Sequence, residues 1–318
     1  KGQPTLGSTS YAAENPPFGA IFTYYLQDLP KTSKAKRQAS EKTMRAKNSS
    51  IPFPAWDTLR QELKETAPKA LLLVKDENGN PVRWIEGAKT KGLHRTNWDL
   101  RLPAPNPIRL TRPSFQPPWA GEATGPLAAP GQYSVELYLL NNGDLTMQGE
   151  AQTFQVIAVP TVAEDTDFQA VTQFQEQTAA LMRQTSSAGA KLSEVQGRLR
   201  HLEAAITKTP KASSKHFATL QQLREQVLDL QMRLYGDPIR QQFSESTVPS
   251  IAERVGGIAY GHWSTRQMPT QTFKDDLAIA TKEFAKFKVD LKVYLEALEA
   301  FEGSLEKAGA PFTRGRGF

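Results

Sequence analysis

The chain has 318 residues, of which 39% are hydrophobic and 23% charged, with a formal net charge of +6 and no cysteine. These proportions are typical of a folded globular protein with room for two domains. The lack of cysteine excludes disulfides, thiolate metal sites and cysteine nucleophiles, and no apolar run approaches the roughly 18 residues of a transmembrane helix.

The first predicted strand spans residues 18–26, a run of aromatic and β-branched residues. The excess positive charge follows it, in residues 31–47. This segment has one acidic residue, Glu41, against seven basic ones: Lys31, Lys34, Lys36, Arg37, Lys42, Arg45 and Lys47. Faces that bind nucleic acid add aromatic or polar base contacts to such charges, whereas Ala, Ser and Thr separate them here. We interpret the segment as a solvated helix or a mobile insertion, and expect no nucleic-acid partner.

Short apolar runs separated by turn residues continue to about residue 157. A helix is predicted from Ala55 to Glu65, and further strands over residues 70–75, 82–85, 92–100, 133–139 and 153–157. Asn78-Gly79 and Asn142-Gly143 can supply the positive φ angles of tight hairpins. About six strands with turns between them predict an immunoglobulin-like β-sandwich over residues 1–163, with the basic helical segment inserted at about 30–66.

The boundary between two domains is predicted near residue 160. Pro160 ends a strand there, and Asp165, Thr166 or Asp167 can cap a helix. Beyond it, apolar residues recur at alternating spacings of three and four.

Three such seams are present, over residues 171–206, 220–234 and 273–305, and a shorter helix is indicated near residues 251–258. Apolar seams of this spacing pack against each other in near-parallel helices. Residues 164–318 are therefore predicted to form an antiparallel helical bundle of three long helices plus a short one. The predicted fold class is α+β, with more than one domain.

Motifs from both halves resemble known modules. Residues 76–83, 92–101 and 129–137 follow the order of hairpin, Gly-x-His-x-x-x-Trp-Asp and Pro-Gly-x-Tyr strand. This order resembles an immunoglobulin-like module of exported bacterial proteins. Three further segments resemble the C-terminal region of large bacterial BNR-repeat, sortilin-like β-propeller proteins; they are residues 15–26, 261–265 and 305–316.

The resemblance spans nearly the whole chain and implies a setting. It implies a C-terminal accessory region of a larger exported bacterial protein, in the periplasm, on the cell surface or secreted. Its implied partner is an upstream β-propeller or a second copy. Such proteins are often labelled glycosyl hydrolases because of their propellers, but no Ser-x-Asp-x-Gly-x-x-Trp box occurs here. Residues 1–14 resemble the exit from a propeller, and the start without an apolar signal core indicates a mature form, a fragment or a protein without a signal peptide.

No catalytic residue, metal site or cofactor is predicted. His94, His201, His216 and His262 lie apart without metal-ligand spacing, and His94 and His262 are interpreted as structural. Residues 76–80 are interpreted as a hairpin turn, because the twelve-residue calcium pattern is incomplete.

The candidate binding residues are Phe115 and Trp119, on a proline-stiffened loop. Aromatic side chains on a rigid loop can stack on sugar rings or fill a partner's pocket; the alternative is that they cap the sandwich core or dock onto the bundle. The chain is therefore hypothesised to be a non-catalytic scaffold or docking region. The alternatives are a carbohydrate-binding module that assists a glycoside hydrolase and, third, hydrolase activity of its own.

Overall fold

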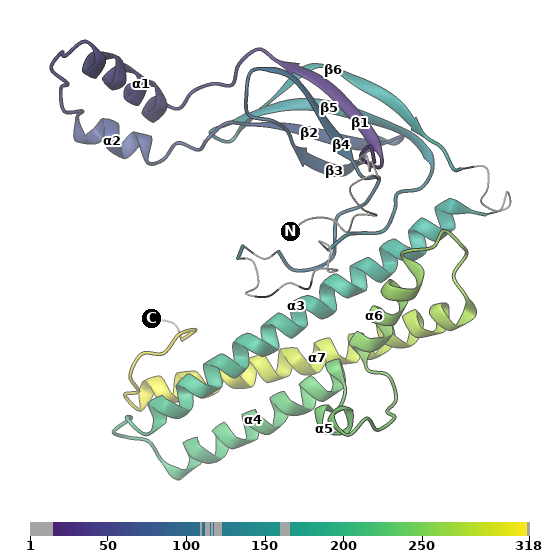
Figure 1. The fold of residues 1–318 in the computed structure, drawn as a ribbon. Coiled ribbons are helices and arrows are strands. Elements are labelled where there is room, and N and C mark those ends of the chain that lie inside the picture. The colour runs from purple at the N-terminus through teal and green to yellow at the C-terminus, as the bar shows by residue number, and fades with distance from the viewer. Residues whose placement is uncertain are drawn as a thin grey trace, which may run out of the picture. The chain divides into compact units, whose positions relative to one another are not determined.

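The computed structural model describes residues 15–108, 110–111, 115, 117, 123–159 and 166–316. Within them the chain is α+β, as predicted, with two antiparallel sheets and seven helices (Figure 1). It divides into two compact units, of which the first comprises Lys1–Pro103 and Ala128–Val162. The second comprises Ala104–Leu127 and Ala163–Phe318, so residues 104–127 group with the helices.

The first unit contains all six predicted strands. They are β1 (Ala20–Leu26), β2 (Lys69–Asp76), β3 (Pro81–Glu86), β4 (Gly92–Trp98), β5 (Gly131–Asn141) and β6 (Asp144–Val156). β1 pairs with β4, and the other sheet has the order β3-β2-β5-β6, with every pairing antiparallel. β6 begins nine residues before its predicted start, because the tight turn after β5 lets it pair along nearly the whole of that strand.

Both predicted hairpin turns are confirmed by the backbone. Asn142 and Gly143 have φ angles of 49° and 93°, the two positive values that a type I′ turn requires. In the β2–β3 turn, the Asp76 carboxylate accepts hydrogen bonds from the backbone N–H groups of Asn78 and Asn80, at 3.0 and 2.7 Å. This carboxylate therefore holds the turn, as the hairpin interpretation of residues 76–80 expects.

The two sheets share one aromatic core. Trp98 of β4 is 1% exposed, and its ring centroid lies 5.1 Å from that of Tyr133 on β5 and 6.2 Å from that of Phe154 on β6. Both polar tips are satisfied, because the indole N–H donates to the carbonyl of Arg101 and the Tyr133 hydroxyl donates to that of Ala129. The apolar bodies of these side chains are thus buried without leaving a polar group unpaired.

The basic segment contains a helix, as the first of the two interpretations expects. α1 (Ser33–Ala46) begins at Thr32, whose hydroxyl accepts the N–H of Ala35, and none of its residues is buried. α2 (Trp56–Glu62) follows it and packs on it. We call residues 31–66 the α1–α2 arm.

The second unit contains five helices among the described residues. They are α3 (Phe168–Ile206), α4 (Ser214–Tyr235), α5 (Pro238–Gln242), α6 (Ile251–His262) and α7 (Gln271–Lys307). The three long helices and the shorter α6 were predicted, whereas α5 was not. α3 packs on α4 and α6, and α7 packs on the same two helices (Figure 1).

Helix caps and buried seams explain why these segments fold as they do. The Asp167 carboxylate accepts the N–H of Ala170, which confirms one of the predicted caps, and Ser250 and Glu253 form a reciprocal capping box at α6. The predicted seam positions are buried except Phe273 and Leu277, which are half-buried, and Leu192, Leu202, Phe287, Leu298 and Leu305 are completely buried. No helix in the described part of the chain is both long and apolar enough to cross a membrane.

Candidate functional site

The predicted binding loop is described only in part. The side chain of Phe115 is 73% exposed, and so does not cap a core within the described structure. Trp119 lies outside the described residues. The described residues of the loop therefore offer one exposed aromatic ring, and the pairing of Phe115 with Trp119 stays a prediction.

The four histidines are not brought together in a metal site. The described residues hold no group of three His, Cys, Asp or Glu side chains that could bind a metal ion. His94 on β4 is within hydrogen-bond distance of the Thr90 carbonyl and contacts the ring of Tyr24. His216 accepts the Ser213 N–H at the start of α4, and His201 is exposed on α3.

His262 has the packing role that the sequence indicates. It is 2% exposed and lies edge-on to the rings of Phe174 on α3 and Phe273 on α7. The side-chain nitrogen of Gln175 lies 3.0 Å from the His262 carbonyl and 3.3 Å from Nδ1, while Nε2 lies 2.9 Å from the Gln267 carbonyl. Burial lowers the pKa of the imidazole, so its neutral form is favoured.

Arg266 extends this buried polar cluster. Its guanidinium donates to the carbonyl of Leu127 at 3.1 Å and to the hydroxyl of Thr172 at 3.2 Å, and stands over the ring of Phe168. Leu127 belongs to the same unit as the helices. Arg266 therefore fixes the end of the 104–127 segment to α3, and the cluster around His262 joins helices rather than forming an open site.

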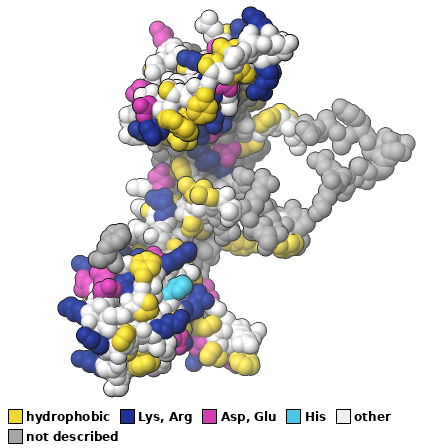
Figure 2. Space-filling view, turned by 90° about the vertical axis from the view of Figure 1, so that its left-hand side faces the viewer, with side chains coloured by type: hydrophobic (Ala, Val, Ile, Leu, Met, Phe, Trp, Pro, Cys, Tyr) yellow, Lys and Arg dark blue, Asp and Glu magenta, His cyan; other side chains and the backbone are white. Residues whose placement is uncertain are grey.

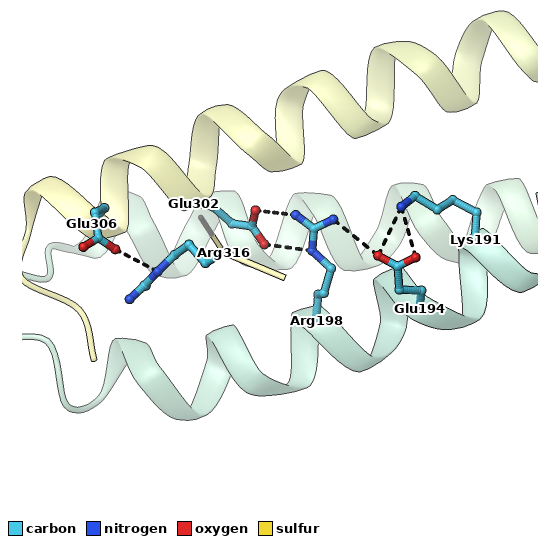
Figure 3. A network of polar contacts seen from close by, with 6 residues as sticks. All are labelled: Lys191, Glu194, Arg198, Glu302, Glu306 and Arg316. Carbon is cyan, nitrogen blue, oxygen red and sulfur yellow. Dashed lines mark hydrogen bonds and ion pairs between the residues drawn. The ribbon is translucent and has the colours of Figure 1, made fainter. Parts of the chain in front are cut away.

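A second polar network joins α3 to α7 (Figure 3). Arg198 donates two hydrogen bonds to the Glu302 carboxylate, one of them from Nε at 3.0 Å. Glu302 is buried, and only 11% of the Arg198 side chain is exposed. Burial opposes the positive charge of Arg198, but the hydrogen bonds to Glu302 and the negative charges of Glu302, Glu194 and Glu299 together outweigh it and raise the pKa of the guanidinium. Lys191 and Glu194 extend the network along α3.

Arg316, beyond the end of α7, completes the surroundings of this network. It pairs with Glu306 at 2.8 Å and donates to the carbonyl of Ala310 at the same distance. A cavity of about 360 Å³ separates Arg316 from Arg198 and Glu302 and is lined by all three. Since each charge that is buried here has an opposite partner, the network stabilises the packing of α3 on α7.

The surface between α4 and α7 is different, because apolar side chains are exposed there. Val289 and Val293 on α7 are both exposed. They lie outside the buried seam, four residues apart, and therefore form one apolar stripe along α7. Large apolar side chains gathered on one surface indicate an interaction site.

A groove of about 280 Å³ runs beside these residues. Its walls include Leu230 and Arg233 from α4, and Val293 and Tyr294 from α7. Arg233 pairs with Asp290 across the groove at 2.6 Å. The Tyr294 hydroxyl is buried without a hydrogen-bond partner among the described residues, and burial raises its pKa. We call this groove, together with Val289 and Val293 beside it, the α4–α7 groove.

A wider cavity of about 850 Å³ shares two walls with the groove, Asp229 and Arg233. It extends toward α5 and α6, where Val248 is exposed at its edge. The α4–α7 groove was not predicted from the sequence. The only signal was the pair Val289 and Val293, two apolar residues at a helical spacing outside the seam.

The comparisons with known proteins returned no similar protein. No protein-family model matches the chain, and no curated protein or solved structure matches it significantly.

Proposed function

We propose that this chain is a non-catalytic docking region of a larger exported bacterial β-propeller protein, and that its α4–α7 groove is the docking surface. The observation that carries the proposal is the exposed apolar stripe of Val289 and Val293 on α7, beside the groove. Removing apolar surface from water stabilises association by about 25 cal/mol per Å². A polar rim that includes Arg233 and Asp290 would orient a partner there.

The occupant that we assign is the propeller upstream in the same protein. The support is the resemblance of residues 15–26, 261–265 and 305–316 to the region that follows such propellers. The same resemblance supports an extracytoplasmic location. A second copy of the chain is the competing occupant, and the solution mass distinguishes the two.

We further infer that the first unit is an immunoglobulin-like sandwich and that the second is an antiparallel bundle. Two antiparallel sheets around the buried Trp98 support the first assignment. So does the hydrogen bond from Tyr133 to the carbonyl of Ala129 four residues upstream, since immunoglobulin-like domains have a comparable tyrosine corner. Three long helices with buried seams support the second.

The test is a measurement of mass by sedimentation velocity, on the chain alone and mixed with the upstream propeller. The variant Val289→Asp/Val293→Asp places two charges in the α4–α7 groove. Ile279→Asp is the matched control, since Ile279 is also an exposed aliphatic residue of α7 but does not line the groove. We expect the wild type and the control to form a complex with the propeller, and the double variant to remain free. The proposal would be contradicted if the chain were monomeric and its mass were unchanged in the presence of the propeller.

One observation favours carbohydrate binding as a second candidate function. The Phe115 ring is largely exposed on a proline-rich loop, as a ring that stacks on a sugar must be. A glycan array with the wild type, Phe115→Ala and Trp119→Ala tests it. Sugar-dependent signal that both variants lose would support this function, whereas an array without signal for the wild type would remove it.

A further inference from the structure

The α1–α2 arm carries most of the net positive charge of the chain. Residues 31–66 contain nine Lys or Arg and four Asp or Glu, a net charge of +5. Seven of the basic side chains are exposed and form no ion pair within the described residues: Lys31, Lys34, Lys36, Lys42, Arg45, Lys47 and Lys64.

The acidic residues of the arm are used to hold it together. Glu41 and Glu62 both pair with Arg37, and Asp57 pairs with Arg60. The carboxylate of Glu65 accepts the backbone N–H of Ser33 at 2.7 Å, which closes the base of the arm. The seven exposed Lys and Arg side chains are therefore available to bind a negatively charged partner.

Helical geometry distributes these cations along two sides of α1. Arg37, Glu41 and Met44 are half-buried and define the face that packs on the rest of the arm. At 100° per residue, Lys34, Lys42 and Arg45 lie to one side of that face, and Lys36 and Lys47 lie to the other. The arm thus presents positive charge on both sides.

Phe53 in the loop between the two helices and Trp56 at the start of α2 form an exposed aromatic pair. Phe53 and Trp56 are 70% and 68% exposed, and their ring centroids lie 5.2 Å apart at an interplanar angle of 61°. Pro52 and Pro54 flank Phe53, and since proline has no backbone N–H, the loop has fewer donors to desolvate at an apolar surface. In Figure 2, which views the molecule from the left-hand side of Figure 1, hydrophobic side chains and Lys or Arg side chains lie next to each other in the upper part.

We propose that the α1–α2 arm binds the surface of an anionic lipid bilayer. Phe53 and Trp56 enter the boundary between head groups and acyl chains, and the exposed Lys and Arg side chains contact the anionic head groups. Peripheral membrane elements combine these two features, apolar insertion and basic residues at the surface. The positive charges of the arm match the negative charges of the head groups, and its aromatic rings match the amphipathic interface of the bilayer.

The geometry of the rings favours a bilayer over a single-stranded nucleic acid. Proteins that bind single strands offer open ring faces on which successive bases stack. Phe53 and Trp56 instead pack edge to face, so each ring covers part of the other. Ala, Ser and Thr separate the basic residues of the arm at irregular intervals. Lipid head groups can still pair with these residues, because the head groups are mobile and are not held at fixed distances from each other.

Co-sedimentation with lipid vesicles tests the proposal. We expect the full chain to sediment with vesicles of phosphatidylglycerol and phosphatidylcholine in equal parts, but not with phosphatidylcholine alone. The variant Lys34→Gln/Lys42→Gln/Arg45→Gln should bind about a hundredfold more weakly, because each basic residue at an anionic surface contributes about 1 kcal/mol. Its control is Lys208→Gln/Lys211→Gln/Lys215→Gln, which removes the same charge from exposed positions outside the arm and should bind like the wild type.

The aromatic pair has its own variant and a direct readout. Phe53→Ser/Trp56→Ser should lose vesicle binding, whereas Ile239→Ser/Phe243→Ser, which changes two exposed apolar residues near α5, should retain it. Addition of anionic vesicles should shift the tryptophan emission of the wild type to shorter wavelength, and Trp56→Phe should abolish this shift. Far-UV circular dichroism checks that each variant is folded.

Three results would overturn the proposal. The first is that the wild type fails to sediment with the anionic vesicles. The second is binding that both arm variants retain. The third is that the arm variants lose affinity for a single-stranded oligonucleotide while their vesicle binding is unchanged, which would assign the arm to nucleic acid instead.

Discussion

Arg37 of α1 holds Glu62 of α2 through two hydrogen bonds, from Nε to Oε1 and from Nη2 to Oε2, both at 2.7 Å. The same guanidinium also donates to Glu41 one turn further along α1. Two parallel N–H to carboxylate bonds fix both the distance and the orientation of the partners. Since no residue of α1 is buried, this contact is the main determinant of how the two helices of the arm pack.

We therefore expect Glu62→Gln to loosen the arm without unfolding the sheets. A glutamine keeps the shape of the side chain but loses the charge and one acceptor. Hydrogen exchange should become faster in α1 and α2 and remain unchanged in β2 and β5. Asp57→Asn is the control, since its pair with Arg60 is exposed and such pairs contribute little. Equal exchange in Glu62→Gln and wild type would contradict this role of the pair.

Acid should open the arm in the same way. The hydrogen bonds from Arg37 hold the pKa of Glu62 below its usual range. A carboxyl group whose folded pKa is lowered stabilises the structure above its unfolded pKa, and this stabilisation is lost as the pH falls through the folded value. Protection of the α1 amides should thus persist at neutral pH and decline below about pH 4, the usual carboxyl range. In Glu62→Gln the decline should be absent.

The ion pair between Arg198 and Glu302 leads to a prediction about the helical unit. Breaking one side of a buried pair leaves the other charge without compensation, which costs about 3 kcal/mol or more. Glu302→Gln should lower the free energy of unfolding of this unit by about that amount, measured by urea denaturation followed by circular dichroism. Lys191→Gln, in an exposed pair of the same network, should cost less than about 1 kcal/mol. Similar losses in the two variants would show that burial does not set the strength of the network.

Local signals in the sequence were sufficient for most of the fold. The strands flanking Asn78-Gly79 and Asn142-Gly143 follow from turn chemistry, and the long helices follow from apolar spacing and from caps such as Asp167. The first half of β6 was missed although residues 144–152 alternate between polar and apolar, because they include Gly149 and few β-branched or aromatic residues. α5 was missed because five residues are too few to show helical periodicity.

The candidate site was less accessible from the sequence, because it depends on contacts between distant residues. Arg198 and Glu302 are 104 residues apart, and nothing near either residue indicates the other. The α4–α7 groove likewise needs Leu230 and Arg233 beside Val293 and Tyr294, which only the packing of two helices brings together. The neighbouring prolines were enough to single out Phe115 as a candidate. The sequence did not indicate that its side chain is exposed.

His262 makes the stability of the helical unit depend on pH. Burial lowers the pKa of its imidazole in the folded state, and the nearby positive charge of Arg266 acts in the same direction. As the pH falls through about 6.5, the usual value for histidine, the unfolded chain takes up a proton that the folded chain does not. The free energy of unfolding therefore decreases below about pH 6.5.

Urea denaturation between about pH 7 and pH 5 measures this dependence, which spans the usual titration range of histidine. His262→Gln should be less stable than the wild type at neutral pH, but its midpoint should change less across this interval. His201→Gln, at an exposed position of α3, should keep the slope of the wild type. If His262→Gln kept that slope too, another group would have to account for it.

Two glycines with equal space around them should respond to alanine in opposite directions. Neither Gly143 nor Gly197 has an atom within 4 Å of the position that a Cβ would occupy, so a steric clash is absent at both. Gly143 has a φ of 93° in the β5–β6 turn, a conformation that costs an L-residue about 1 kcal/mol or more. Gly197 lies within α3, where alanine is favoured over glycine by about 1 kcal/mol.

Gly143→Ala should therefore lower the free energy of unfolding of the sheet unit by about 1 kcal/mol, and Gly197→Ala should raise that of the helical unit by a similar amount. Thermal denaturation followed by circular dichroism measures both, since each change corresponds to a shift of a few degrees in Tm. Gly143→Asn is the control for the turn, because asparagine tolerates a positive φ and should be closer to the wild type. Equal destabilisation by alanine at both positions would mean that space, and not backbone conformation, selects glycine there.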